Sequence, residues 1–422
     1  MLKSRSAFVA TGLAVNGLVL ARGLVLMVAL DYEALGYVGL VQVAMACVGL
    51  LHFGVLNGGY RLLCHARPRT QQRIVDLAYT AFAAIGAALI LGAGMVSFAM
   101  NHPTYHSIAV FSVVGGLATL IRSWVHNELV AGQRLSAVNA INAASTLASL
   151  AILALLITDR PIVAPEWIAV SAIAAQPILF VAIALMSGAA KRPRALRFSK
   201  LMARPIFAAG FALFLTGLAL QIIPLIERVY VSRTLGLEAL GQLYLSILFI
   251  ALFQIVPNLV QQVFLAPMVE LWRRKDLPTL RRDMRRLMGL ITAYCAVAAT
   301  ALTFLAEPIL TAILPEYAPD LRWVYLIAPG LIAFALAGPF ALCFNILIDY
   351  RWHLGAYGAG LMTATVSFGV AFVSDTPLTL DQVTLIRSFV FALMGLILVI
   401  GTTRIHKTAP HFRLFQARQS LS

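Results

Sequence analysis

Charged residues are scarce in this chain, and acidic residues are the scarcest of them. Only 12% of the 422 residues are charged, 61% are hydrophobic, and 17 are Asp or Glu. A soluble domain carries about twice that share of charge, so the composition excludes a soluble protein. The apolar runs are long and continuous rather than alternating, which excludes a transmembrane barrel. The composition therefore predicts an all-α integral membrane protein.

Residues that build disulfide frameworks, metal sites and catalytic centres are few and dispersed. The four cysteines, Cys47, Cys64, Cys295 and Cys343, lack paired spacing, so neither a disulfide framework nor a zinc site is indicated. The eight histidines are scattered, and no Ser/His/Asp or metal-ligand pattern emerges. We therefore expect a protein that is not an enzyme and that holds no cofactor.

What the sequence does contain is a repeat with a fixed offset of 205 residues. The sequence TGLA at 11–14 recurs at 216–219, and EALG at 33–36 recurs at 238–241. From residue 7 to residue 55 this offset gives 14 identities in 49 positions. In a membrane protein, two tandem copies predict two helical bundles that face each other across a substrate path.

Twelve apolar stretches are long enough to span a bilayer, whose hydrocarbon core of about 30 Å needs roughly 20 apolar residues. We place them at 7–29, 37–59, 77–99, 107–127, 135–157, 167–187, 206–230, 240–265, 287–306, 324–346, 355–373 and 384–403. The predicted fold has twelve transmembrane helices in two pseudo-symmetric six-helix bundles. Its predicted parts are an N-terminal lobe (1–190), a basic cytoplasmic linker (191–205), a C-terminal lobe (206–405) and a cytoplasmic tail (406–422).

Lysine and arginine are concentrated on one side of the predicted helices. On that side lie 26 of the 32, in the N-terminal segment, the even-to-odd helix connections, the adjoining helix ends and the tail. This bias predicts that both termini are cytoplasmic. The net charge of +15 could suggest nucleic acid, but no nucleic-acid-binding motif or aromatic stacking pattern accompanies the cations. Anionic membrane lipids explain the charge better, so we expect lipids and not nucleic acid as partners.

Few polar groups interrupt the predicted helices, and they recur at matching depths. Under the offset Asn16 corresponds to Gln221 and Arg22 to Glu227, which Arg228 follows directly. A charge at the bilayer centre costs at least about 2.5 kcal/mol and persists only where it faces protein or water. Two interpretations of these residues remain open. Arg22 and Glu227 form an ion pair that locks the two lobes, or the arginines bind an anion in a cavity. A pair that breaks on opening would be a gate.

The predicted helix at 240–265 carries a stripe of amides. Gln254, Asn258 and Gln262 are spaced by four residues, which puts them on one face of its inner half. Such a stripe either lines a wet cavity or bonds to neighbouring helices, and we favour the cavity.

Arg122 and His126 lie one turn apart near the inner end of the fourth predicted helix. A long side chain at that depth can extend to the membrane surface. Arg122 therefore has two interpretations, an anchor at the cytoplasmic boundary or a ligand for an anion.

The two copies resemble the oligosaccharide flippases of the multidrug/oligosaccharidyl-lipid/polysaccharide exporter superfamily. In the first copy the similar stretch is 30–60, with 33–39 opening the second helix and 54–61 closing it. The second copy is similar in the acidic-Arg pair at 227–228, where such sequences more often have Asp than the Glu found here. Further similar positions are Leu235-Gly236, Gly241 with Tyr244, Pro267 and the stretch 345–351. In motif order and span count the resemblance covers nearly the whole chain.

The resemblance implies a V-shaped pair of bundles in the bacterial cytoplasmic (inner) membrane. It implies translocation of undecaprenyl-pyrophosphate-linked oligosaccharide repeat units for surface polysaccharide synthesis, with that glycan lipid and glycan-assembly membrane proteins as partners. Combining it with the polar residues, we assign Arg22, Arg122 and Arg228 to phosphate binding and Gln254 and Asn258 to the sugars. We assign Glu227 to gating or to coupling with a H⁺ or Na⁺ gradient.

Two other functions remain open. A multidrug or cation exporter of the same superfamily would need a predominantly acidic cavity, whereas Glu227 is the one deep acid in the predicted helices and adjoins Arg228. A polytopic glycan polymerase or acyltransferase would present acid, base or metal-binding groups on a sizeable outer segment. The longest predicted outward segment, 307–321, has about 15 residues and contains neither His nor Cys.

Overall fold

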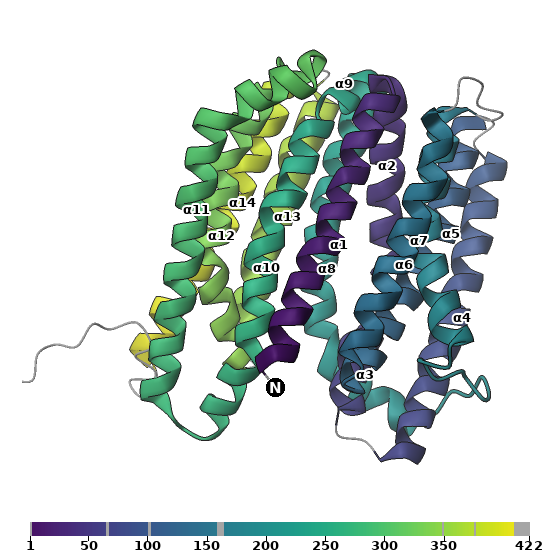
Figure 1. The fold of residues 1–422 in the computed structure, drawn as a ribbon, viewed down its shortest axis with the longest axis vertical. Coiled ribbons are helices and arrows are strands. Elements are labelled where there is room, and N and C mark those ends of the chain that lie inside the picture. The colour runs from purple at the N-terminus through teal and green to yellow at the C-terminus, as the bar shows by residue number, and fades with distance from the viewer. Residues whose placement is uncertain are drawn as a thin grey trace, which may run out of the picture. The chain divides into compact units, whose positions relative to one another are not determined.

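The computed structural model describes residues 2–64, 67–99, 103–157, 164–347, 350–374 and 377–408. In these ranges it contains fourteen α-helices, two short 3-10 helices and no strand (Figure 1). The chain divides into two compact units, Met1–Gly241 and Gln242–Ser422.

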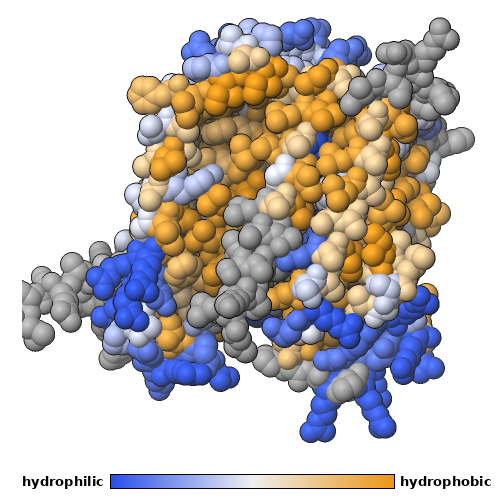
Figure 2. Space-filling model, viewed as in Figure 1, coloured by the Kyte–Doolittle hydropathy of each residue, from blue (hydrophilic) through white to orange (hydrophobic). Residues whose placement is uncertain are grey.

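The surface of the helices is that of a membrane protein. Eleven helices of the described residues are long and apolar enough to span a membrane, and Ala14–Ala29 of α1 (Leu2–Ala29) is a shorter apolar helix. Large apolar side chains point outward, among them Met95 (70% exposed), Phe304 (69%) and Val373 (82%). Figure 2 shows hydrophobic residues over the middle of the helices and hydrophilic residues at their ends. Lipid stabilises such a surface and water does not. The all-α multi-pass fold predicted from the composition is confirmed.

The first unit is built around α5, which packs against α2, α4 and α7. Its fully buried core includes Ile74, Leu120, Trp124 and Phe180. The elements besides α1 are α2 (Tyr32–Gly49), α3 (Val55–Leu63), α4 (Pro68–Ala99), α5 (Pro103–Ala131), α6 (Leu135–Leu153), η1 (Ala154–Ile157), α7 (Pro165–Met186), α8 (Lys200–Thr234) and α9 (Leu237–Gln242).

The helix that opens the second sequence copy, α8, packs extensively against α2 and α3 of the first copy. The first compact unit is therefore larger than the first repeat. The boundaries at 190 and 206, which the repeat predicts for the two lobes, therefore differ from the boundary between the compact units. They stay a prediction of which parts of the chain move as rigid bodies.

The predicted helix at 37–59 is wrong in one respect, because residues 50–54 interrupt it. Phe53 (φ 46°) and Gly54 (φ 91°) adopt the left-handed conformation, which ends α2 and begins α3. A Cβ atom on Gly54 would lie 2.8 Å from the carbonyl carbon of Gly210 on α8. Glycine is therefore required at position 54 both by the backbone conformation and by this contact. The Gly54 N–H donates to Nδ1 of His52 at 3.0 Å, which satisfies a backbone group that the break frees.

The second unit is organised on α12, which packs against α10, α11 and, most extensively, α14. Gly330 permits the close approach of α12 and α14, because a Cβ atom there would overlap the Ser388 carbonyl. The Gly330 N–H also donates to the Ser388 hydroxyl at 3.1 Å. The elements are α10 (Tyr244–Arg273), α11 (Leu277–Ile313), η2 (Pro315–Tyr317), α12 (Leu321–Leu347), α13 (Arg351–Val373) and α14 (Leu380–Thr408). The predicted helix at 240–265 thus begins in the short α9 and continues as α10.

Candidate functional site

The two copies of the EALG motif lie against each other within the first unit. A Cβ atom on Gly36 of α2 would overlap the carbonyl oxygen of Leu237 on α9, and one on Gly241 would overlap the carbonyl oxygen of Tyr32. The offset of 205 residues relates Gly36 to Gly241 and Tyr32 to Leu237. The contact is therefore reciprocal, as it is at a two-fold axis. This reciprocal glycine contact lies at the helix ends that are predicted to face outward.

The adjacent pair Glu227 and Arg228 is buried on α8, with 4% and 6% of the residue surface exposed. Nη1 of Arg228 donates a hydrogen bond to the carbonyl oxygen of Gly39 on α2. Further along the same pair of helices, the Cys47 thiol of α2 donates to the Gln221 carbonyl of α8 at 3.4 Å. Arg228, a predicted phosphate ligand, therefore also takes part in the packing of α8 on α2.

Arg122 points into the first unit between α6 and α7. Its Nη2 donates to Oδ1 of Asn142 at 3.1 Å, and its Cζ lies 5.4 Å from the ring centroid of Phe180. The helix that carries Arg22, α1, packs against α6, to which Arg122 bonds. Arginines that are partly buried among apolar helices attract an anion.

The predicted amide stripe lies on α10 of the second unit. Gln254 is half-buried and Asn258 is exposed, whereas the adjacent Phe253 and Pro257 are buried. Gln254 and Asn258, one turn apart, are thus each more exposed than the residue that precedes them on α10. The side chain of Gln262, the third member, lies outside the described residues.

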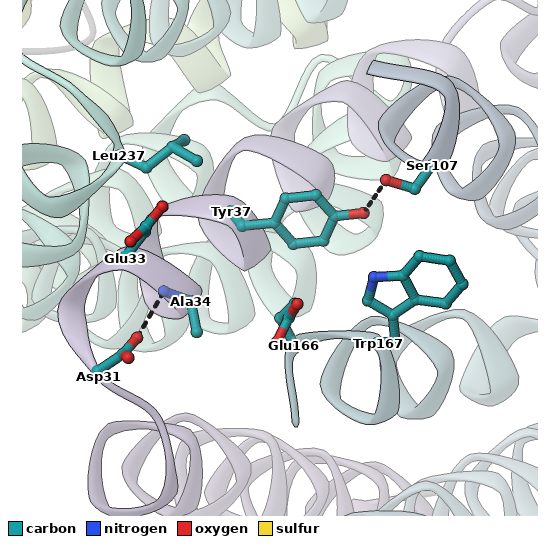
Figure 3. Close-up of a pocket in the computed structure, with 8 residues that line it drawn as sticks. All are labelled: Asp31, Glu33, Ala34, Tyr37, Ser107, Glu166, Trp167 and Leu237. Atoms are coloured by element: carbon teal, nitrogen blue, oxygen red, sulfur yellow. Dashed lines mark hydrogen bonds between the residues drawn. The ribbon is translucent and has the colours of Figure 1, made fainter. Parts of the chain in front are cut away.

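A cavity of about 430 Å³ in the first unit was not predicted from the sequence (Figure 3). Three carboxylates surround it, beside the Tyr37 hydroxyl, which donates to Ser107 at 2.8 Å. Asp31 also accepts from the Ala34 N–H at 2.8 Å and so caps α2. The sequence feature that could have indicated this cavity is the group of acidic residues in the predicted outward links at 31–36 and 158–166. The lining residues of this outer cavity are Asp31, Glu33, Ala34, Tyr37, Ser107, Glu166, Trp167 and Leu237.

The Tyr37–Ser107 hydrogen bond ties α2 to α5 at the outer cavity. Tyr37→Phe is expected to lower the free energy of unfolding by about 0.5–1.5 kcal/mol, because it deletes only this bond. Ser107→Ala should have a similar effect, and the double variant should lose no more than either single one. Unfolding of the purified protein in mixed micelles measures all three. Additive losses would show that the two hydroxyls do not act as a pair.

Among the described residues, no group of three or more His, Cys, Asp or Glu side chains could hold a metal ion. The carboxylates of the outer cavity therefore do not form a recognisable metal-ligand set.

No family model and no curated protein sequence matches this chain. Among solved structures it is similar to an inward-facing multidrug resistance MATE family transporter of the MOP superfamily, with a TM-score of 0.70, 10% identity, and 97% and 100% of the two chains covered. It is similar to the lipid II flippase MurJ in an inward closed conformation, with a TM-score of 0.71, 13% identity, and 94% and 87% covered. A MOP superfamily transporter from Pyrococcus furiosus, described as having a binding pocket of reverse polarity, is similar with a TM-score of 0.59, 14% identity, and 98% and 96% covered. The chain therefore has the fold of these membrane transporters, with its two repeated halves.

Proposed function

We propose that this protein translocates a polyprenyl-pyrophosphate-linked oligosaccharide repeat unit across the bacterial cytoplasmic membrane by alternating access. The observation that carries the proposal is the half-buried Arg122, which donates to Asn142 on α6, the helix against which α1 with the half-buried Arg22 packs. A pyrophosphate is multiply anionic, and the planar guanidinium binds phosphate oxygens through two parallel donors. Such a headgroup would offset the cost of holding the two arginine charges partly buried among apolar helices.

The fold accommodates more than one substrate class, since the similar structures include a lipid II flippase and multidrug transporters. The fold alone therefore does not select the substrate. Of the predicted ligands in the first unit, Arg22, Arg122 and Arg228 are cationic and Glu227 is acidic, which favours an anionic lipid over an organic cation. A polyprenyl tail can remain in the bilayer while only the headgroup enters the protein.

The sugar part of the substrate would contact α10. An exposed amide such as Asn258 is costly against lipid but favourable against water or hydroxyl groups. Gln254 lies one turn away on the same side of the helix. Both side chains offer donors and acceptors, which is what binding of sugar hydroxyls requires.

In the proposed cycle, the reciprocal glycine contact separates when the substrate path opens outward. Backbone contacts of this kind have two discrete arrangements, closed and parted, rather than a continuum. Glu227, buried beside Arg228, would exchange partners during this change and is the proposed residue for coupling to H⁺ or Na⁺.

Arg22→Gln and Arg122→Gln test the proposal, because glutamine keeps a polar side chain and removes the charge. Each is expected to reduce flipping at least about tenfold, since a hydrogen bond to a charged group contributes about 1.5–3 kcal/mol. Initial flipping rates in proteoliposomes, and surface glycan in cells that lack the native gene, measure the effect. Arg282→Gln, an exposed change on α11, is the matched control. Unchanged flipping with normal protein levels would remove both arginines from the mechanism.

A second function, export of an organic cation, has one observation in its favour. The outer cavity combines three carboxylates with Trp167, and aromatic faces also attract cations. Loss of cation efflux in a Glu33→Gln/Glu166→Gln variant, with no effect of Arg22→Gln, would select this function over the first.

A further inference from the structure

The segment between α7 and α8, residues 187–199, is fastened to the end of the first unit that is predicted to be cytoplasmic. Oε1 of Glu128 accepts the backbone N–H of Lys191 at 2.8 Å, and Oδ1 of Asp76 accepts that of Arg194 at 2.9 Å. Nη1 of Arg134 donates to the Ala189 carbonyl at 2.6 Å. The segment is therefore docked on the first unit, and residues 187–199 are called the strap below.

The way in which the strap is fastened determines what its side chains can do. Glu128 and Asp76, the acids that touch it, bond to its backbone and not to its guanidinium groups. The side chains of Arg194, Arg197 and Lys200 are exposed, and the ion pairs found in the described part of the chain are formed by other residues. The four cations of residues 187–199 outnumber the two acids that touch the strap, so the strap keeps a positive charge.

Two large apolar side chains are interleaved with these cations. Leu196 is 64% exposed and Phe198 is 59% exposed, so neither contributes to the core of the unit. Exposed apolar groups between cations are typical of a surface that enters the headgroup layer of a membrane. The strap residues Arg194, Leu196, Arg197 and Phe198, together with Lys200 at the start of α8, are called the strap surface below.

The position of the strap fits such a layer. The helix α8 begins at Lys200, and the last cation before its apolar run is Arg204. The first five residues, about 7.5 Å at 1.5 Å per residue, therefore form a cationic start of the helix that fits the headgroup layer. Further exposed cations lie on α4 at Arg69 and Arg73, next to Gln72, which donates to the Arg192 carbonyl at 3.0 Å.

We infer that the strap surface binds anionic phospholipid headgroups of the leaflet on its own side of the membrane. The cations would contact the phosphates, and Leu196 and Phe198 would enter between the acyl chains. Charge complementarity selects anionic over zwitterionic lipid, and the exposed apolar pair selects a bilayer over a soluble anion. The inference does not rest on the proposed transport function, because it uses only contacts of the strap.

Lipid photocrosslinking with the full-length protein in nanodiscs tests the inference. The nanodiscs contain phosphatidylcholine and phosphatidylglycerol, with a trace of either lipid carrying a photoreactive group near the headgroup. We expect the phosphatidylglycerol probe to label peptides covering 192–204 at least fivefold more than the phosphatidylcholine probe. In R194Q/R197Q/K200Q the two probes should label equally. Because the three side chains are exposed, the variant should elute like the unmodified protein in size-exclusion chromatography.

K275Q/R282Q/R285Q, which removes three exposed cations from the second unit, is the matched control and should leave labelling of 192–204 unchanged. L196Q/F198Q should lower labelling by both probes at least threefold, since it removes the apolar contact and keeps the charge. Equal labelling by the two probes in the unmodified protein would overturn the inference. So would a preference for phosphatidylglycerol that survives in R194Q/R197Q/K200Q.

Discussion

Gly36→Ala and Gly241→Ala are each expected to lower the free energy of unfolding by about 3 kcal/mol, the upper end of the usual cost of overpacking. The added methyl group would overlap the carbonyl of Leu237 or of Tyr32. A backbone carbonyl cannot rotate away as a side chain does, so α2 and α9 would have to separate. The two variants should have similar effects because the contact is reciprocal.

Thermal denaturation followed by fluorescence-detected size-exclusion chromatography measures the loss. Gly17→Ala on α1 and Gly217→Ala on α8 are the matched controls, since a Cβ atom there meets nothing within 4 Å. Alanine is the better helix former by about 0.5–1 kcal/mol, so the controls should be neutral or slightly stabilising. If Gly36→Ala denatures like Gly17→Ala, the motifs do not meet as described.

Arg228→Met is expected to destabilise the protein by about 3 kcal/mol. It removes the charged donor to the Gly39 carbonyl, and a hydrogen bond to a charged group contributes about 1.5–3 kcal/mol. Arg228→Lys should lose less, because it keeps the charge but not the planar fork of donors.

Denaturation in mixed micelles measures these variants against Arg204→Met, an exposed arginine on the same helix that should be nearly neutral. The result also separates two roles of Arg228. If Arg228→Met is as stable as Arg204→Met but flipping is lost, Arg228 acts on the substrate alone. A large loss of stability would make Arg228 part of the packing between α2 and α8.

The helices were predictable because the bilayer imposes one solution on a long apolar run. The break between α2 and α3 was not, since residues 50–54 read as a continuation of an apolar helix. Its causes are the left-handed conformation at Phe53 and Gly54 and the close approach of Gly210, a partner more than 150 positions away. Contacts of this kind have no periodicity that a sequence pattern could reveal.

The candidate site was predictable in its residue types and not in its partners. The sequence indicates that Arg22, Arg122 and Arg228 are unusual in apolar helices, and the structure places all three in the first unit. The partner of Arg228 is a backbone carbonyl, which has no signature in the sequence. The outer cavity was missed because its walls come from the starts of α2, α5 and α7 and from α9.

The reciprocal glycine contact also bears on how the chain arose. A half-length ancestor that paired with a second copy of itself would have made both sides of this contact with a single glycine. Any side chain at that codon would then have damaged the homodimer twice. Duplication and fusion of such a gene would have turned the one codon into two that mutate independently, and glycine stands at both positions of this chain.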